Sequence, residues 1–199
     1  MPFEIHGLTR SAFLARSALT AGALYGAGSV TPLVSRALAQ SGDVDILNFA
    51  LTLEYLESTF YAQALQQVKK LSSETRALAT EIRANEDAHV DALTDAVKQA
   101  GGKPVAAPGV DFGDAFADEK SFLALAQTFE DTGVSAYNGA APAIKSPQLL
   151  AAAGSIVQIE ARHAALIRLA NGVTPAPDQF DPSLDQDAVL KAVMPYVKG

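Results

Sequence analysis

The sequence predicts an all-α fold, in which four long helices form a bundle with one long crossover between the second and third helices, plus a short C-terminal helix. Apolar residues recur at helical spacing in four segments, whereas the alternation typical of strands is nowhere sustained. The connections between these segments are short, long and short. Only the long one has room to carry the chain back along the bundle.

The first 39 residues predict an export signal peptide. Arg10 and Arg16 give a positive start, residues 19–34 are apolar and rich in Ala and Gly, and Ala37-Leu38-Ala39 has the small-x-small pattern of a cleavage site. The start resembles a twin-arginine leader, although Ser11 stands where the second arginine belongs, so the general secretory route is an alternative. We therefore expect a protein of the periplasm or the extracellular space.

The chain after the leader predicts one bundle domain over residues 40–172 and a tail with a short helix over residues 173–199. An uncleaved membrane anchor is the alternative for the leader, but Thr20, Ser29 and Pro32 interrupt an apolar run that is short for a spanning helix. No later segment is a candidate span. We expect no membrane contact once the leader is removed.

The net charge and the cysteine count limit the classes of partner and chemistry that this chain can have. The formal net charge is −7, and the leader holds three Arg and one Glu, so the rest of the chain is more acidic still. An acidic surface offers no basic patch for nucleic acid and suits metal cations as partners. The chain has no cysteine, which excludes disulfides, thiolate metal sites and thiol catalysis.

Two predicted helices precede the crossover. The first runs from about residue 43 to Lys70, with Ser41 or Asp43 as its cap, and is apolar nearly all round. The second starts at Ser72 or Ser73 and stops at Gly101-Gly102. Because the turn between them is only a residue or two, they must be antiparallel neighbours.

Two further helices follow the crossover. The third spans roughly residues 118–141, and the fourth begins at Ser146-Pro147, a cap and a first-turn proline, and ends at Asn171-Gly172. The crossover over residues 102–117 can reach up to about 53 Å at ~3.3 Å per residue, more than the roughly 40 Å length of a 25-residue helix. A short helix is expected over residues 183–196 of the tail.

The histidines carry the main functional signal. Apart from His6 in the leader, the chain has only His89 and His163, and each lies three residues after a glutamate, Glu86 and Glu160. Residues three apart share one face of a helix, so each pair aims two ligand groups at one point. The doubled motif predicts one site with two metal ions.

Such a site also needs a carboxylate from each of the other two helices. The third helix offers Glu130, which lies in the apolar stripe of that helix. The first helix offers Glu54 and Glu57, and each lies in an apolar line, so periodicity alone does not choose between them. Burying four unpaired glutamates would cost several kcal/mol per group, whereas two divalent cations would balance their charge.

A family resemblance supports Glu54. Glu54 and Tyr61 repeat the Glu-x6-Tyr pattern of the first helix in ferritins and bacterioferritins, and the likeness extends from Leu47 to His163. The chain resembles the exported ferritin-like domain proteins, a family similar to the desiccation-related proteins of plants. The resemblance implies a ferritin-like bundle with Glu54 as a metal ligand, and leaves Glu57 as the alternative ligand or as a second acid beside the site.

Carboxylates with one imidazole per ion suit Fe or Mn, and the lack of thiolate argues against a structural zinc site. We therefore expect two Fe or Mn ions at six residues, namely Glu54, Glu86, His89, Glu130, Glu160 and His163. The expected activity is oxidation of Fe(II) by O₂ or peroxide, or a peroxide reaction of the kind that manganese catalases carry out, and the sequence does not decide between them.

Tyr61 and Tyr137 lie on the site faces of their helices, where they are candidates to donate electrons or hydrogen bonds. Ordinary core packing is the alternative for both. The alternative function is a non-catalytic stress or desiccation protein in which metal only stabilises the bundle. The motifs leave open whether the chain forms a homo-oligomer.

Overall fold

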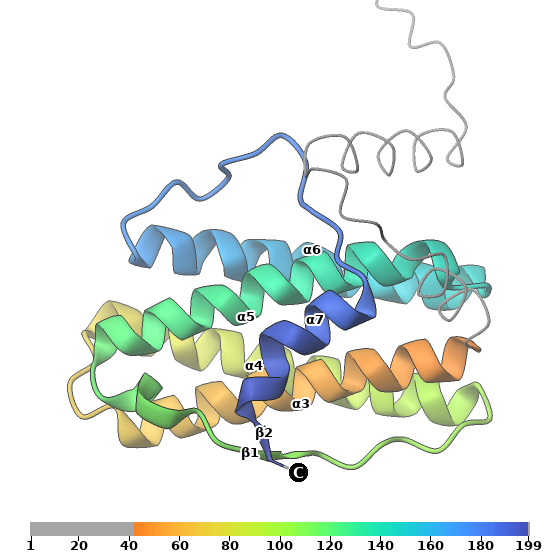
Figure 1. Cartoon of the computed structure of the whole chain (residues 1–199), viewed down its shortest axis with the longest axis horizontal. Helices are drawn as coiled ribbons and strands as arrows, with labels where there is room; N and C mark the ends of the chain where they lie inside the picture. Colours follow the sequence, from red (N-terminus) through yellow and green to blue (C-terminus); the bar gives the residue numbers. More distant parts are fainter. Residues whose placement is uncertain (1–41, 199) are drawn as a thin grey trace, which may run out of the picture.

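The computed structural model describes residues 42–198, which form four long helices and a short helix on the outside of the bundle (Figure 1). The long helices are α3 (Asp43–Gln67), α4 (Ser73–Gln99), α5 (Glu119–Ala140) and α6 (Pro147–Ala170). The all-α prediction with one long crossover is confirmed. The predicted signal peptide lies outside the described residues. Within the described part, no helix has the length and apolar character needed to cross a membrane.

Two of the predicted helix caps are present. The Ser72 hydroxyl accepts a hydrogen bond from the Thr75 amide at 3.1 Å, and the Ser146 hydroxyl accepts one from the Leu149 amide at 3.3 Å. Each bond satisfies an amide that has no partner inside the helix, and Pro147 follows at a position where a missing N–H costs nothing. These caps fix the starts of α4 and α6.

The predicted start of the first helix is wrong in detail. Its cap is Gly42, whose amide donates to the Asp45 carboxylate at 3.3 Å. Asp43 instead accepts from the backbone amides of Lys145 and Ser146 at 2.8 and 2.9 Å. Asp43 therefore joins the start of α3 to the start of α6, a role that depends on tertiary contact. The helix also ends at Gln67, three residues before the predicted end.

The crossover returns along the length of the bundle, as predicted (Figure 1). It contains the two-residue strand β1 (Gly109–Val110) and the 3-10 helix η1 (Gly113–Phe116). β1 pairs antiparallel with β2 (Val197–Lys198) near the end of the chain. The sequence did not predict this pairing, because two residues are too few to show strand alternation.

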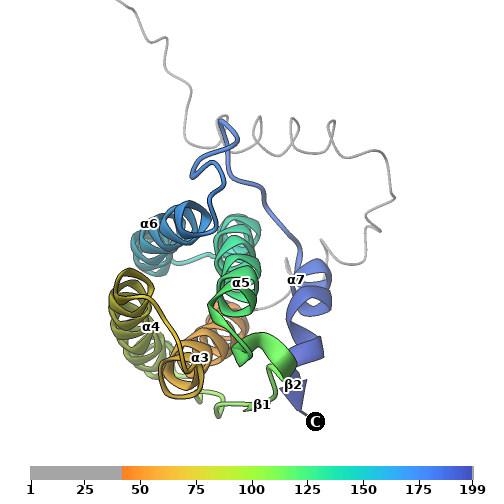
Figure 2. The same cartoon turned by 90° about the vertical axis from the view of Figure 1, so that its left-hand side faces the viewer.

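The tail carries α7 (Gln186–Val193), three residues shorter at its start than predicted, followed by the 3-10 helix η3 (Met194–Tyr196). α7 packs on the outside of α5 (Figure 2). The Leu184 amide donates to the Ser135 carbonyl of α5 at 2.9 Å. The Leu184 backbone lies so close to Gly139 that a Cβ at position 139 would collide with it. The tail therefore crosses α5 where only glycine fits.

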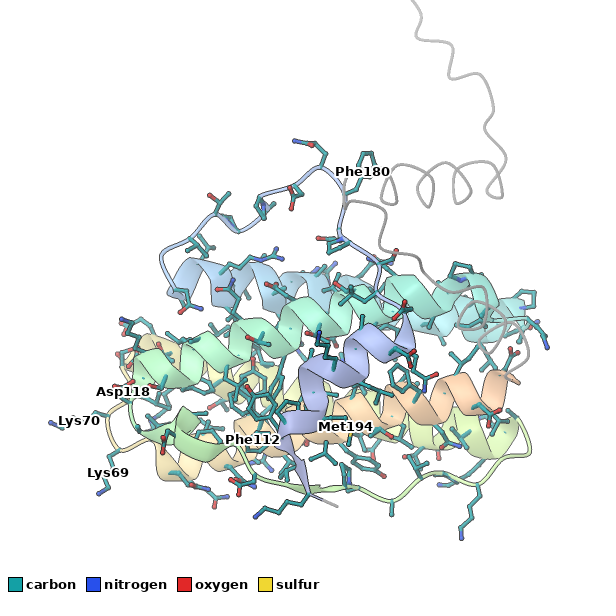
Figure 3. All side chains as sticks on the ribbon, in the orientation of Figure 1. Lys69, Lys70, Phe112, Asp118, Phe180 and Met194 are labelled. Carbon is teal, nitrogen blue, oxygen red and sulfur yellow. The ribbon has the colours of Figure 1, made fainter. Side chains whose placement is uncertain are left out.

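The apolar core has two parts along the bundle. One part is rich in aromatic residues and includes Phe60, Phe122 and Phe129, with Phe112 of the crossover packed among them. The other part is aliphatic and includes Leu51, Leu93, Val97 and Ile156. Phe180 and Met194 remain exposed on the outside (Figure 3). On α4 and α6, the Glu-x-x-His motifs fall between the residues that belong to the two parts.

Candidate metal centre

The middle of the bundle holds six buried polar residues, at least one from each long helix. α3 supplies Glu54, α4 supplies Glu86 and His89, α5 supplies Glu130, and α6 supplies Glu160 and His163. All four carboxylates are fully buried, and the two histidines are 8% and 3% exposed. The structure thus brings together all six residues that the sequence singled out.

These residues form two overlapping groups whose ligand atoms lie within 4.8 Å of one another. The first group contains Glu54 and His89, and the second contains Glu130 and His163. Glu86 and Glu160 belong to both groups. Two positions that share two carboxylates are the arrangement of a dinuclear site.

The shared carboxylates divide their oxygens between the two positions. His89 Nδ1 lies 3.1 Å from Glu86 Oε2 and 3.0 Å from Glu160 Oε1. His163 Nδ1 lies 2.9 Å from Glu86 Oε1 and 3.9 Å from Glu160 Oε2. Each of the two glutamates therefore directs one oxygen to each histidine, which is the geometry of a bridging carboxylate.

Each position is completed by one carboxylate that it does not share. Glu54 Oε2 lies 3.2 Å from His89 Nδ1, and Glu130 Oε2 lies 3.5 Å from His163 Nδ1. A position so formed offers three carboxylates and one imidazole nitrogen. These are ligand types that suit Fe or Mn.

The hydrogen bonds within the site do not satisfy its buried polar atoms. His89 Nδ1 faces three carboxylate oxygens, and one N–H cannot serve three acceptors. Buried atoms without a hydrogen-bond partner include Glu86 Oε1, Glu130 Oε2, both oxygens of Glu160 and His163 Nδ1. Such atoms are costly unless something else binds them. Their convergence fits a pair of cations coordinated by the four helices.

In the metal-free protein, bound protons offset part of the negative charge of the site. Burial disfavours charged imidazoles, but the surrounding carboxylates outweigh it and raise the pKa of His89 and His163 to about 12. Burial also disfavours charge on Glu86, yet the two imidazoles lower its pKa to about 2. Burial raises the pKa of Glu130 to about 8 and that of Glu54 well above its usual range. Metal binding must displace these protons.

Two tyrosines hold the unshared carboxylates in place. The Tyr61 hydroxyl of α3 donates to Glu130 Oε1 of α5 at 2.5 Å, and the Tyr137 hydroxyl of α5 donates to Glu54 Oε1 of α3 at 2.5 Å. Burial and the adjacent carboxylates raise the pKa of both phenols well above 10, so both remain donors. Both tyrosines therefore contact the site, in addition to their packing in the core.

Asn85 contacts the site, although no sequence pattern singled it out. Its side-chain amide lies 3.0 Å from Nε2 of His163, the ring nitrogen opposite the carboxylates. A partner at that nitrogen fixes the orientation and tautomer of a metal-binding histidine. The sequence shows only that Asn85 directly precedes Glu86. Its contact with His163 joins α4 to α6, which are far apart in the sequence, and so leaves no local pattern.

A helical bundle with one long crossover and a buried core of paired Glu-x-x-His motifs defines the class of ferritin-like proteins. The sequence profile of the ferritin-like domain family matches residues 42–173, and the chain belongs to this family. The comparison with curated proteins gave no match. The resemblance identified from the Glu-x6-Tyr pattern is thus confirmed at the level of the family.

Proposed function

We propose that the protein is an exported ferritin-like oxidoreductase that binds two Fe or Mn ions per chain and oxidises Fe(II) with O₂ or peroxide. The observation that carries the proposal is the division of the Glu86 and Glu160 oxygens between the two histidines. The predicted leader supports export to the periplasm or beyond.

Each residue has a distinct task in this proposal. Glu86 and Glu160 hold the two positions together, and His89 and His163 each complete one of them. Two bound ions would supply the redox electrons and the open coordination positions at which O₂ or peroxide is reduced. The four glutamates of the two ligand groups balance the charge of two divalent cations, which limits the cost of burying them.

Hydrogen bonds from two tyrosines support this arrangement. Tyr61 and Tyr137 each tie an unshared carboxylate of one helix to a neighbouring helix. The apolar parts of the core on either side limit the access of water, which strengthens electrostatic contacts between ligands and cations. Ligands held in this way have the geometry needed for coordination before a metal ion binds.

The test combines metal analysis with turnover of the full-length protein. After loading with Fe(II) or Mn(II), we expect two ions per chain and continued consumption of O₂ with Fe(II), or of peroxide. Glu160→Gln should lower both readouts, whereas the exposed Glu81→Gln should leave them unchanged. Two bound ions with no turnover would support the alternative of a metal-stabilised stress protein. Absence of bound metal would contradict both functions.

A further inference from the structure

A fifth buried acid lies beside the site, in addition to the four glutamates of the two ligand groups. Glu57, one helical turn after Glu54 on α3, is only 3% exposed. It belongs to neither of the two ligand groups found among the described residues. Burial, followed by the charge on Glu160, raises its pKa well above the usual range. A buried carboxyl is costly to keep without a partner, so its position calls for a physical reason.

Comparison of α3 with α5 shows what is unusual about Glu57. Both helices carry a glutamate followed seven residues later by a tyrosine, Glu54 with Tyr61 and Glu130 with Tyr137. The two pairs exchange hydrogen bonds, since each tyrosine donates to the glutamate of the other helix. Three residues after the glutamate, however, α3 has Glu57 and α5 has Gly133. The site is therefore nearly symmetric except at this position.

Gly133 leaves space that Glu57 uses. A Cβ at position 133 would lie 3.1 Å from Glu57 Oε1 and 3.5 Å from Glu160 Oε2. Both oxygens thus approach the backbone of α5 at Gly133, where there is no side chain. Glu160 Oε2 is the oxygen that this bridging residue directs to His163 rather than to His89. Glu57 consequently lies beside the position formed by Glu130 and His163.

We propose that Glu57 is an additional carboxylate of the Glu130/His163 position and makes the two metal positions unequal. This inference rests on the proposed dinuclear site. When a cation is bound, an ionised Glu57 beside it raises the affinity of that position, whereas the Glu54/His89 position gains little. Gly133 contributes by leaving room for the Glu57 side chain.

The test is a calorimetric titration of metal-free, full-length protein with Mn²⁺ at fixed pH. Wild type should bind two ions in two distinguishable steps, and Glu57→Gln should weaken one step by about 10–100-fold, as expected for loss of a group supporting a metal ligand. The other step should change less than about twofold. Gly133→Ala should weaken the same step, because the added methyl group displaces Glu57 from its place. Glu81→Gln is the control for loss of one exposed charge.

Two single-position backgrounds assign the affected step. Glu54→Gln leaves the Glu130/His163 position intact, and adding Glu57→Gln should weaken its binding. Glu130→Gln leaves the Glu54/His89 position intact, and adding Glu57→Gln should not change its affinity. Circular dichroism in chelator checks that each variant folds.

The inference and the proposed function fail in different ways. If wild type binds two ions and Glu57→Gln changes neither step, or weakens both equally, the inference is overturned while the dinuclear site stands. If wild type binds no Mn²⁺ or Fe²⁺, the proposed function itself fails. Comparison of wild type with Glu57→Gln tests the inference even if the Glu54→Gln and Glu130→Gln variants bind no metal.

Discussion

Replacing Glu130 by glutamine separates the role of metal from the role of packing. Glutamine has nearly the shape of glutamic acid, and its carbonyl can accept the Tyr61 hydrogen bond that Glu130 Oε1 accepts. Because burial raises the pKa of Glu130 to about 8, the group is mostly neutral at pH 7 in the metal-free protein. Glu130→Gln should therefore change the metal-free stability by less than about 1 kcal/mol.

The same substitution should have a large effect when metal is present. An ion at a free concentration 1,000 times its Kd stabilises the folded state by about 4 kcal/mol. For a chain of this size, each kcal/mol shifts Tm by roughly 2–4 °C. If Glu130→Gln abolishes one ion, the metal-dependent gain in Tm should fall by about 8–16 °C, the product of these two values.

Thermal unfolding followed by circular dichroism, with excess Mn²⁺ and with chelator, measures both quantities. The exposed Glu81→Gln is the matched control and should retain the full metal-dependent gain. An equal fall in Tm with metal and with chelator would show that Glu130 contributes through packing alone. That result would refute its role as a ligand.

Three further predictions concern the protonation of Glu130, the hydrogen bond from Tyr61 and the contact of the tail with α5. The folded metal-free protein holds the Glu130 proton more tightly than the unfolded chain, so this contribution to its stability should fall as pH rises from about 4.5 to 8. Over the same range the metal-dependent gain in Tm should grow. Denaturant unfolding in chelator measures the free energy of unfolding, and no fall with pH would contradict the predicted protonation. Tyr61→Phe should keep two ions but cost about 1–3 kcal/mol of stability, since it leaves Glu130 Oε1 without its donor; an unchanged free energy of unfolding would exclude this contact as a stabilising one. Gly139→Ala should release the tail from α5, lower the stability by about 1–3 kcal/mol and speed proteolysis of the tail. The control Gly154→Ala has open space at its Cβ and should be neutral or stabilising by up to about 1 kcal/mol. Equal behaviour of the two variants would argue against the close crossing.

The helical bundle and five of the six clustered residues, all but Glu54, were predictable because both depend on local spacing. A period of 3.6 residues shows which segments are helical, and Glu-x-x-His places both ligand groups of a pair on one face. The alternation of short and long connections then indicates the crossover. None of these inferences needs a distance between segments that are far apart in the sequence.

The choice between Glu54 and Glu57 could not be made in this way. Residues three apart on a helix point in similar directions, and α3 is apolar nearly all round, so both acids face inward. The structure buries both, but only Glu54 joins a ligand group. The difference lies in what α5 and α6 place opposite each acid, notably the space at Gly133.

The contacts of Asn85, Asp43 and Leu184 were missed for a related reason. Each bond joins segments that the sequence separates by tens of residues, and none repeats with a period. The tail also buries Val189 and Val193 in the core, but a helix of eight residues shows too little periodicity to indicate where it docks. A sequence reports such contacts only when a motif already ties them to a function.

Anomalous diffraction from crystals of the Mn-loaded protein tests the central claim most directly. We expect two metal peaks inside the bundle, one beside His89 and one beside His163, with Glu86 and Glu160 each contributing an oxygen to both. Metal found only on the outer surface, or a single central ion without bridging glutamates, would contradict the account.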